Sequence, residues 1–341
     1  MELFDLMKKL TDCDGTSGDE TNAAAVAKAE LEKYMPCEID RMGSVVGSTG
    51  AVGQPILLDA HLDQIGLIVT AIDETGFLKI TACGGADALV LAAAEVTVHG
   101  KENLPGIIVS TPPHLIKEDE RKKARKITEL SVDLGLTKEE AEQKVAVGDR
   151  ITLNAPLKKM LNERVCGASL DDRCGVASLL LCLERLGDLV KELPLRVVFS
   201  ANEETGGSGA KVAAYSAGAS EAIAVDVSFA KAPGVKETVR AKLGKGTMIG
   251  FAPTLDHAMS KELQRLAEEG NIPYQFEVMS GRTGTNADDI ATAGHGAKMA
   301  LLSIPLRNMH TAAEVIDLRD VEATADLMAA YLKNKAVKKD A

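Results

Sequence analysis

Aromatic side chains are scarce in this sequence, at 3% of 341 residues, and tryptophan is absent. This scarcity argues against a protein that binds carbohydrate or single-stranded nucleic acid, because such proteins stack rings and bases on aromatic platforms. Basic residues are outnumbered too, with 39 lysines and arginines against 50 aspartates and glutamates, for a formal net charge of −11. We therefore expect neither nucleic acid nor an anionic membrane surface as a partner.

No apolar run reaches the length of a membrane span, and the first ten residues lack the basic start and long apolar middle of an export signal. A cytoplasmic location is the expectation. The cysteines show no CxxC spacing, so buried or free thiols are expected in place of disulfides or a cysteine metal site. They are Cys13, Cys37, Cys83, Cys166, Cys174 and Cys182.

What the chain does have is an alternation of apolar strands and helices, which predicts a layered α/β domain with a mixed, mostly parallel central sheet. The run at 55–60 is apolar on both faces, as in a central strand. Further strands are expected at 195–200, 222–227 and 299–304, with helices at 175–186, 254–270 and 321–333.

A β-rich stretch interrupts this alternation and predicts an inserted domain. Short β-type runs occur at 65–72, 77–81, 96–99, 107–110 and 150–153. A charged segment at 117–126 is expected to be solvated, and Thr137 with Glu140 forms a capping box that opens a short helix. The predicted division is a main α/β domain at 1–68 and 159–341, with the inserted β-rich domain at 69–158.

Acids and histidines gather where the buried strands end or a helix begins. These residues are His61 with Asp63, Asp171 with Asp172, Glu203 with Glu204, Asp226, and His310. Charges at the end of a buried strand are costly unless they are paired or bind a metal. Ligand sites in open α/β folds lie at the carboxyl ends of the strands, so a site for two divalent cations is the simplest explanation.

Two imidazoles and three carboxylates can hold two cations if one carboxylate bridges them, and such sites activate water for hydrolysis. Mixed nitrogen and oxygen ligands suit Zn²⁺ or Co²⁺, with Mn²⁺ as a third option. Asp63 follows His61 by two residues, which on a strand puts both side chains on one face. It is then placed to accept the imidazole N–H. One residue of the Glu203-Glu204 pair stays free to take a proton from water.

Five segments, in the order DAHLDQIG, ASLDDRCG, FSANEETGGSGA, AIAVDVSFA and IPLRNMHT, resemble the M42 family of metallo-aminopeptidases, which includes glutamyl aminopeptidases, the tetrahedral (TET) peptidases and relatives labelled cellulase M. The resemblance covers nearly the whole chain. It implies that His61 and Asp226 bind one metal, that Glu204 and His310 bind the other, and that Asp171 bridges them.

The resemblance also implies that Glu203 is the general base and that Asp63 orients His61. It further implies that the insertion is a PDZ-like dimerisation domain, that the chain forms homo-oligomers, often dodecamers, and that peptides are the substrates. Three positions depart from the common family pattern, namely Phe229, Asn286 and Asn308. None of the three is a predicted metal ligand, and the substrate-binding residues stay open.

Two alternatives remain at this point. A related two-metal carboxypeptidase or amidohydrolase would use the same ligands on another substrate. A non-catalytic, peptide-binding assembly protein could keep the fold, although the presence of both Glu203 and Glu204 argues against it. A glycoside hydrolase is disfavoured, because adjacent glutamates at one strand end do not supply the facing carboxylates of that chemistry.

Overall fold

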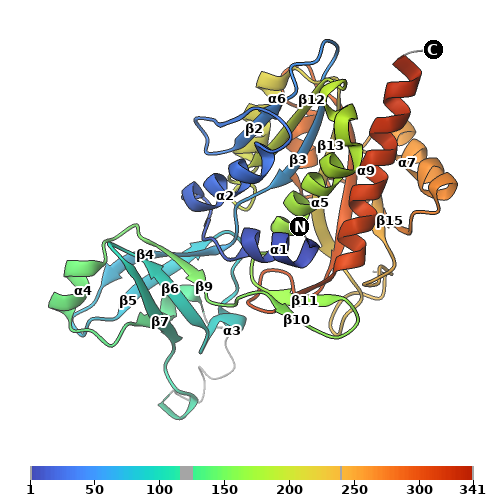
Figure 1. Ribbon diagram of the computed structural model, residues 1–341. Helices are drawn as coiled ribbons and strands as arrows, with labels where there is room; N and C mark the ends of the chain where they lie inside the picture. Colours follow the sequence, from blue (N-terminus) through green and yellow to red (C-terminus); the bar gives the residue numbers. More distant parts are fainter. Residues whose placement is uncertain (1, 116–125, 239, 340–341) are drawn as a thin grey trace.

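The computed structural model describes residues 2–115, 126–238 and 240–339. The predicted charged segment at 117–126 lies, except for Lys126, outside these residues. The described chain forms a layered α/β unit and a separate β-barrel beside it (Figure 1). No described helix is long and apolar enough to cross a membrane.

The layered unit is built on an eight-stranded mixed sheet. In spatial order its strands are β1 (Cys37–Ile39), β2 (Val45–Ser48), β12 (Leu195–Ser200), β3 (Ile56–His61), β13 (Glu221–Phe229), β16 (Lys298–Leu306), β14 (Thr247–Phe251) and β15 (Tyr274–Val278). The four central strands, from β12 to β16, run parallel, whereas β2 and β14 pair antiparallel to them. The predicted α/β fold with a mixed, mostly parallel central sheet is confirmed.

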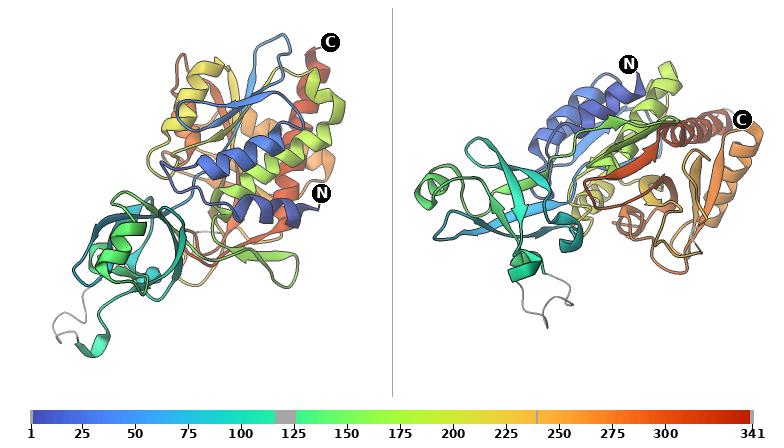
Figure 2. Two further views of the ribbon diagram at one scale, coloured as in Figure 1. Left: turned by 60° about the vertical axis from the view of Figure 1, so that its left-hand side comes forward. Right: turned by 90° about the horizontal axis from the view of Figure 1, so that it is seen from below.

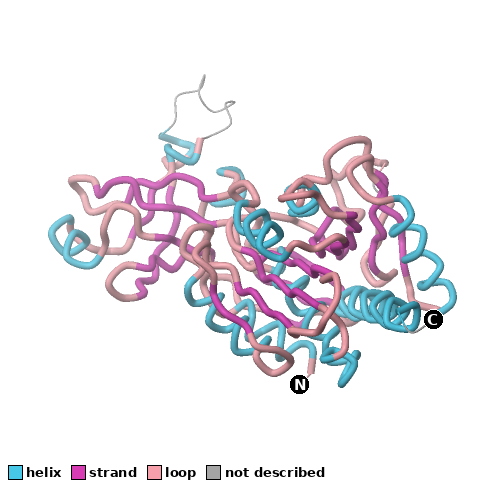
Figure 3. Tube along the Cα trace, turned by 90° about the horizontal axis from the view of Figure 1, so that it is seen from above, coloured by secondary structure: helices cyan, strands magenta, loops and turns pink. Residues whose placement is uncertain are grey.

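One face of the sheet packs against five helices in the larger hydrophobic core. They are α1 (Leu3–Thr11), α2 (Thr21–Leu31), α5 (Leu170–Leu186), α7 (His257–Gly270) and α9 (Leu318–Lys339). The other face packs against α6 (Ser208–Ala217) and α8 (Asn286–Ala291) in a smaller core. Figure 3 shows the strands running between the helices. All six residues of β3 are buried, as the continuous apolar run predicts for a central strand.

A small three-stranded sheet joins two loops that reach the site. It contains β10 (Lys158–Lys159), β11 (Arg164–Gly167) and β17 (Glu314–Asp317). The antiparallel pairing of β11 with β17 places Gly167 opposite Glu314. The start of α5 therefore lies beside the loop that carries His310.

The inserted stretch is a closed barrel of six antiparallel strands, in the order β4 (Gly66–Ile72), β5 (Leu78–Cys83), β8 (Ser131–Asp133), β7 (Asn103–Val109), β6 (Glu95–His99) and β9 (Arg150–Leu153). Two short helices accompany it, α3 (Ala88–Leu91) and α4 (Lys138–Lys144). The predicted capping box of Thr137 and Glu140 opens α4. The barrel has its own hydrophobic core and stands clear of the layered unit except at one end (Figure 2). The PDZ-like assignment and the boundaries at 68/69 and 158/159 remain predictions.

Candidate active site

The candidate site is a pocket of about 360 Å³ at the carboxyl ends of the parallel strands. His61 ends β3, Asp226 lies on β13, the Glu203-Glu204 turn follows β12, and His310 lies in the loop after β16. Asp171 lies at the start of α5. Because the ends of adjacent parallel strands meet at one edge of the sheet, the fold brings together residues that the chain separates by up to 249 positions (310 − 61).

Asp171 lies between two groups of potential ligands. Its Oδ1 is 3.0 Å from Nε2 of His61, and its Oδ2 is 3.4 Å from Nε2 of His310. On the His61 side, Oδ1 of Asp226 is 3.8 Å from the same Nε2. On the His310 side, Oε1 of Glu204 is 3.2 Å from Nε2 of His310. Each side thus forms a three-residue group that could hold one metal ion, and Asp171 belongs to both.

The donor set fits divalent cations. Oε1 of Glu204 is buried and makes no hydrogen bond within the described residues, so it keeps lone pairs for a ligand. Four of the five carboxylates that line this pocket, those of Asp171, Glu203, Glu204 and Asp226, lie together near the two histidines. Their mutual repulsion in a buried site calls for positive charge beyond that of two histidines. Two imidazole nitrogens with carboxylate oxygens are suitable ligands for first-row divalent metals.

The backbone of Asp63 orients His61. Nδ1 of His61 lies 3.1 Å from the backbone oxygen of Asp63 and 3.5 Å from its Oδ1. A carbonyl oxygen can only accept, so in the neutral ring Nδ1 carries the proton and Nε2 is free to face the cluster. Asp63 is not on the strand as the i,i+2 spacing predicted, because β3 ends at His61.

The side chain of Asp63 also holds the Glu203-Glu204 turn. Its Oδ1 accepts the N–H of Glu203 at 2.9 Å, and its Oδ2 accepts the N–H of Glu204 at 3.2 Å. The hydroxyl of Ser17 also donates to Oδ2. Burial alone would raise the pKa of Asp63, but hydrogen bonds from His61, Ser17 and the Glu203 backbone outweigh it, and the pKa lies below its usual value. Asp63 is thus a buried carboxylate whose ionised form is favoured, and it holds the backbone of Glu203 and Glu204.

Several pKa values in the pocket are displaced from their usual values. Burial, together with the charges of Glu204, Asp171 and Asp63, raises the pKa of Glu203 to about 7 against the opposing effect of His61. Its pairing with the carboxylates of Asp171 and Glu204 raises the pKa of His310 to about 10, although burial opposes this.

His61 and Asp226 are shifted in the same direction. Burial lowers the pKa of His61, but hydrogen bonds to Asp171 and Asp63 and the charges of Glu203 and Asp226 carry it well above its usual value. Burial raises the pKa of Asp226 well above its usual value, although the charge of His61 opposes this. Both shifts favour the protonated forms of His61 and Asp226 when no cation is bound.

Sequence reasoning missed two residues that shape the cluster. Glu314 is buried, and its Oε2 accepts the N–H groups of Leu170 and Asp171, while its Oε1 accepts the N–H of His310. It therefore fixes both loops that reach the second group of ligands. The only sign of this in the sequence is an acid directly before the apolar pair Val315-Ile316. Gly85, from the end of the barrel, packs so closely on His310 that an added Cβ would lie 2.3 Å from Nδ1.

The remaining predicted positions lie around the cluster. Asp172 is fully buried and caps α5 from within, with its Oδ1 accepting the N–H of Gly175. Asn286 lies behind the pocket and donates to Asp59 and Ser200. Asn308 donates to the carbonyl of Ala313, and Phe229 lines the pocket half-exposed.

Comparisons with known proteins agree with this geometry. A family model described as M42 glutamyl aminopeptidase matches residues 43–327. Lysyl aminopeptidase from Pyrococcus furiosus is 33% identical over 340 residues, covering 97% of this chain and 96% of the relative. A TET aminopeptidase structure from a Thaumarchaeota archaeon of marine sediment superposes with a TM-score of 0.92 at 30% identity, covering 99% of each chain.

A third relative is the TET1 peptidase of Pyrococcus horikoshii, described as able to assemble into a tetrahedron or a large octahedral shell. It has a TM-score of 0.85 at 29% identity, covering 97% of this chain and 99% of that one. The fold and these matches define an enzyme of the metallo-aminopeptidase class. Within that class the chain belongs to the M42 glutamyl aminopeptidase family.

Proposed function

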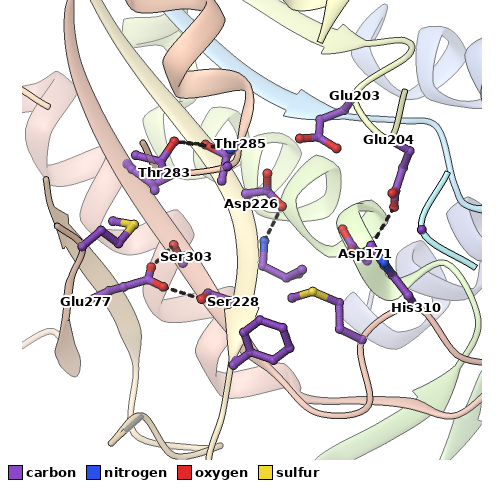
Figure 4. Close-up of a pocket in the computed structure, with 17 residues that line it drawn as sticks. Asp171, Glu203, Glu204, Asp226, Ser228, Glu277, Thr283, Thr285, Ser303 and His310 are labelled. Carbon is purple, nitrogen blue, oxygen red and sulfur yellow. Dashed lines mark hydrogen bonds and ion pairs between the residues drawn. The ribbon is translucent and has the colours of Figure 1, made fainter. Parts of the chain in front are cut away.

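We propose that this enzyme removes N-terminal residues from peptides with the help of two divalent cations, Zn²⁺ or Co²⁺ by preference and Mn²⁺ as the third option. His61 and Asp226 would hold one cation, Glu204 and His310 the other, and Asp171 both. When bound, the cations supply Lewis acidity and lower the pKa of water. The observation that carries the proposal is the position of Asp171, whose Oδ1 faces His61 and whose Oδ2 faces His310. Figure 4 shows Asp171 beside His310 and Glu204.

Glu203 is the general base in this proposal. It belongs to neither three-residue ligand group, yet its Oε2 reaches within 4.0 Å of Nε2 of His61 and its side chain lines the pocket. It takes a proton from the attacking water and passes a proton to the departing amine. Asp63 positions Glu203 through the backbone N–H, so the base is held while its carboxylate stays free.

Substrate type separates this proposal from its rivals. Hydrolysis of aminoacyl anilides with a free α-amino group, but not of their N-acetyl forms, is expected for an aminopeptidase. Hydrolysis of N-acylated substrates would favour a carboxypeptidase or amidohydrolase. Activity should disappear with a chelator and return with Co²⁺ or Zn²⁺. No turnover with any of the three metals would indicate a non-catalytic binding protein.

We also propose that the enzyme works as a homo-oligomer, because a relative of 29% identity is described as assembling into large shells. Mass photometry of the full chain should show a species well above the 36.0 kDa monomer. A monomer alone would overturn this part. The N-terminal preference does not follow from kinship, since the family description says glutamyl and the Pyrococcus furiosus relative is lysyl.

A further inference from the structure

Glu277 lines the active-site pocket but takes no part in the metal-binding groups. It lies on β15, across the pocket from Glu204 and His310 (Figure 4). Its side chain passes over β14, where its register partner is Gly250, which has no side chain to block the path. The carboxylate thereby reaches Ser303 on β16 and Ser228 on β13.

At this end of the pocket both serine hydroxyls donate to the carboxylate of Glu277. The hydroxyl of Ser303 donates to Oε2 of Glu277 at 2.7 Å, and the hydroxyl of Ser228 donates to Oε1. A serine hydroxyl has a single proton to donate. Once both are used, the three side chains present only acceptor lone pairs to a ligand. An ammonium or guanidinium group, which only donates, matches this surface, and a carboxylate does not.

Glu277 also lacks a cation of its own. Among the described residues no ion pair joins it to a lysine, arginine or histidine, and no lysine or arginine lines the pocket. The neighbouring Arg282 instead faces Asp288, with Nε 3.3 Å from Oδ2. The other four carboxylates of the pocket lie at the opposite end, where the proposed cations would balance them. The charge of Glu277 is left for a ligand.

The position suits a long side chain. Ser228 follows Asp226 by two residues on β13, or about 6.6 Å along the strand, which is within reach of the four-carbon stem of lysine. Leu301 and Met279 line the same pocket. Apolar walls of this kind pack against the methylene groups of lysine and arginine while the charged head reaches polar partners.

We infer that Glu277, held by Ser228 and Ser303, selects peptides whose N-terminal residue has a cationic side chain, lysine or arginine. The inference rests on the proposed aminopeptidase function and names its substrate class. The subsite formed by Glu277, Ser228 and Ser303 binds the side chain of the N-terminal residue, while the scissile bond lies at the Asp171 end of the pocket. Acidic N-terminal residues are repelled.

The test compares lysine with norleucine, which has the same carbon chain without the ammonium group. For the metal-loaded enzyme, kcat/KM for lysyl anilide should exceed that for norleucyl anilide roughly 10- to 100-fold, the value of a charge-assisted hydrogen bond. Glutamyl anilide should be the poorest of the three. In Glu277→Gln the lysine-to-norleucine ratio should fall to near one. A fault in folding would lower both rates and leave the ratio unchanged. Glu192→Gln, an exposed carboxylate elsewhere, should keep the ratio.

A second measurement separates this inference from the proposed function. Calorimetry should show L-lysine binding more tightly than L-norleucine, with the difference lost in Glu277→Gln. Equal cleavage of lysyl and norleucyl anilides by the unaltered enzyme would overturn the inference and leave the aminopeptidase proposal standing. If no aminoacyl anilide were cleaved, the proposed function would fail, and the binding experiment alone would decide the subsite.

Discussion

The carboxylate of Asp63 holds the backbone of Glu203, whose N–H donates to Oδ1 across 2.9 Å. The same carboxylate receives the N–H of Glu204. The end of β3 and the turn after β12 are thereby fixed to each other, although the chain separates them by 140 residues. This side chain, together with the direct pairing of β3 and β12, holds the proposed base near His61.

Asp63→Asn should weaken catalysis and metal binding together. An amide has one acceptor oxygen and turns an NH₂ group toward a backbone donor, so one of the two N–H groups loses its partner. We expect a 10- to 100-fold loss in metal affinity or activity, the usual range for residues that orient ligands. The measurements are kcat and cation titration by calorimetry. Asp133→Asn, which removes a carboxylate that accepts the N–H of Gly135 in the barrel, should leave both unchanged.

Glu203→Gln should separate the base from the ligands. We expect kcat to fall by about 10²- to 10⁴-fold, as for a lost general base, while elemental analysis finds the same metal content. Glu204→Gln should instead lose metal, because its oxygen belongs to the His310 group. Near-normal activity in Glu203→Gln would remove that residue from the mechanism.

Cation binding should release protons. The raised pKa values of His310, about 10, and of Glu203, about 7, leave both protonated or partly protonated at neutral pH without metal. A cation displaces these protons, so affinity should rise with pH between about 6 and 9. Calorimetry in buffers of different ionisation enthalpy would count the protons. A pH-independent affinity would contradict the proposed ligands.

The proposed base also fixes the sign of the pH dependence of activity. Glu203 acts only when deprotonated, so kcat/KM should rise with pH through its pKa. Bound cations stabilise the carboxylate and lower that pKa, so the rise should be centred below 7 in the loaded enzyme. An activity that falls over this range would argue against a carboxylate base.

Gly85→Ala should damage the His310 side of the site. An added Cβ would lie 2.3 Å from Nδ1 of His310 and 2.6 Å from its Cε1, so the imidazole must move. We expect lower affinity for one of two cations, with the other retained, in a stepwise titration. Gly281→Ala is a matched control, because a Cβ there meets nothing within 4 Å. Two unchanged binding steps in Gly85→Ala would contradict the proposed role of His310.

Local pattern was enough to predict much of the fold. The strand expected at 195–200 has those bounds in β12, and the buried run at 55–60 is the central strand β3. The candidate metal ligands were predicted for a related reason, because charged residues at the end of an apolar strand are conspicuous in the sequence. The convergence of His61, Asp226 and His310 follows from a rule about parallel strands and needs no coordinates. That rule does not place Asp171, which lies at the start of α5.

What sequence could not supply depends on contacts between distant segments. Glu314 holds Leu170 and Asp171, and Gly85 packs on His310, each across more than 140 residues of chain. Neither Glu314 nor Gly85 has an unusual local setting. Glu277 gave no sign either, since an acid on an edge strand is commonplace until Ser228 and Ser303 are seen beside it. The sequence predicted that Asp63 orients His61, but it gave no sign that the same carboxylate also accepts the N–H groups of Glu203 and Glu204.

The barrel is more than an appendage on the catalytic unit. Gly84 and Gly85 leave β5 and lie against Glu204 and His310, so the insertion supplies part of the wall of the active site. A shortened chain with residues 66–153 replaced by a linker would open that wall to bulk water. The layered unit alone would therefore lack part of its active-site wall. A displacement of the barrel would also move Gly84 and Gly85 relative to Glu204 and His310.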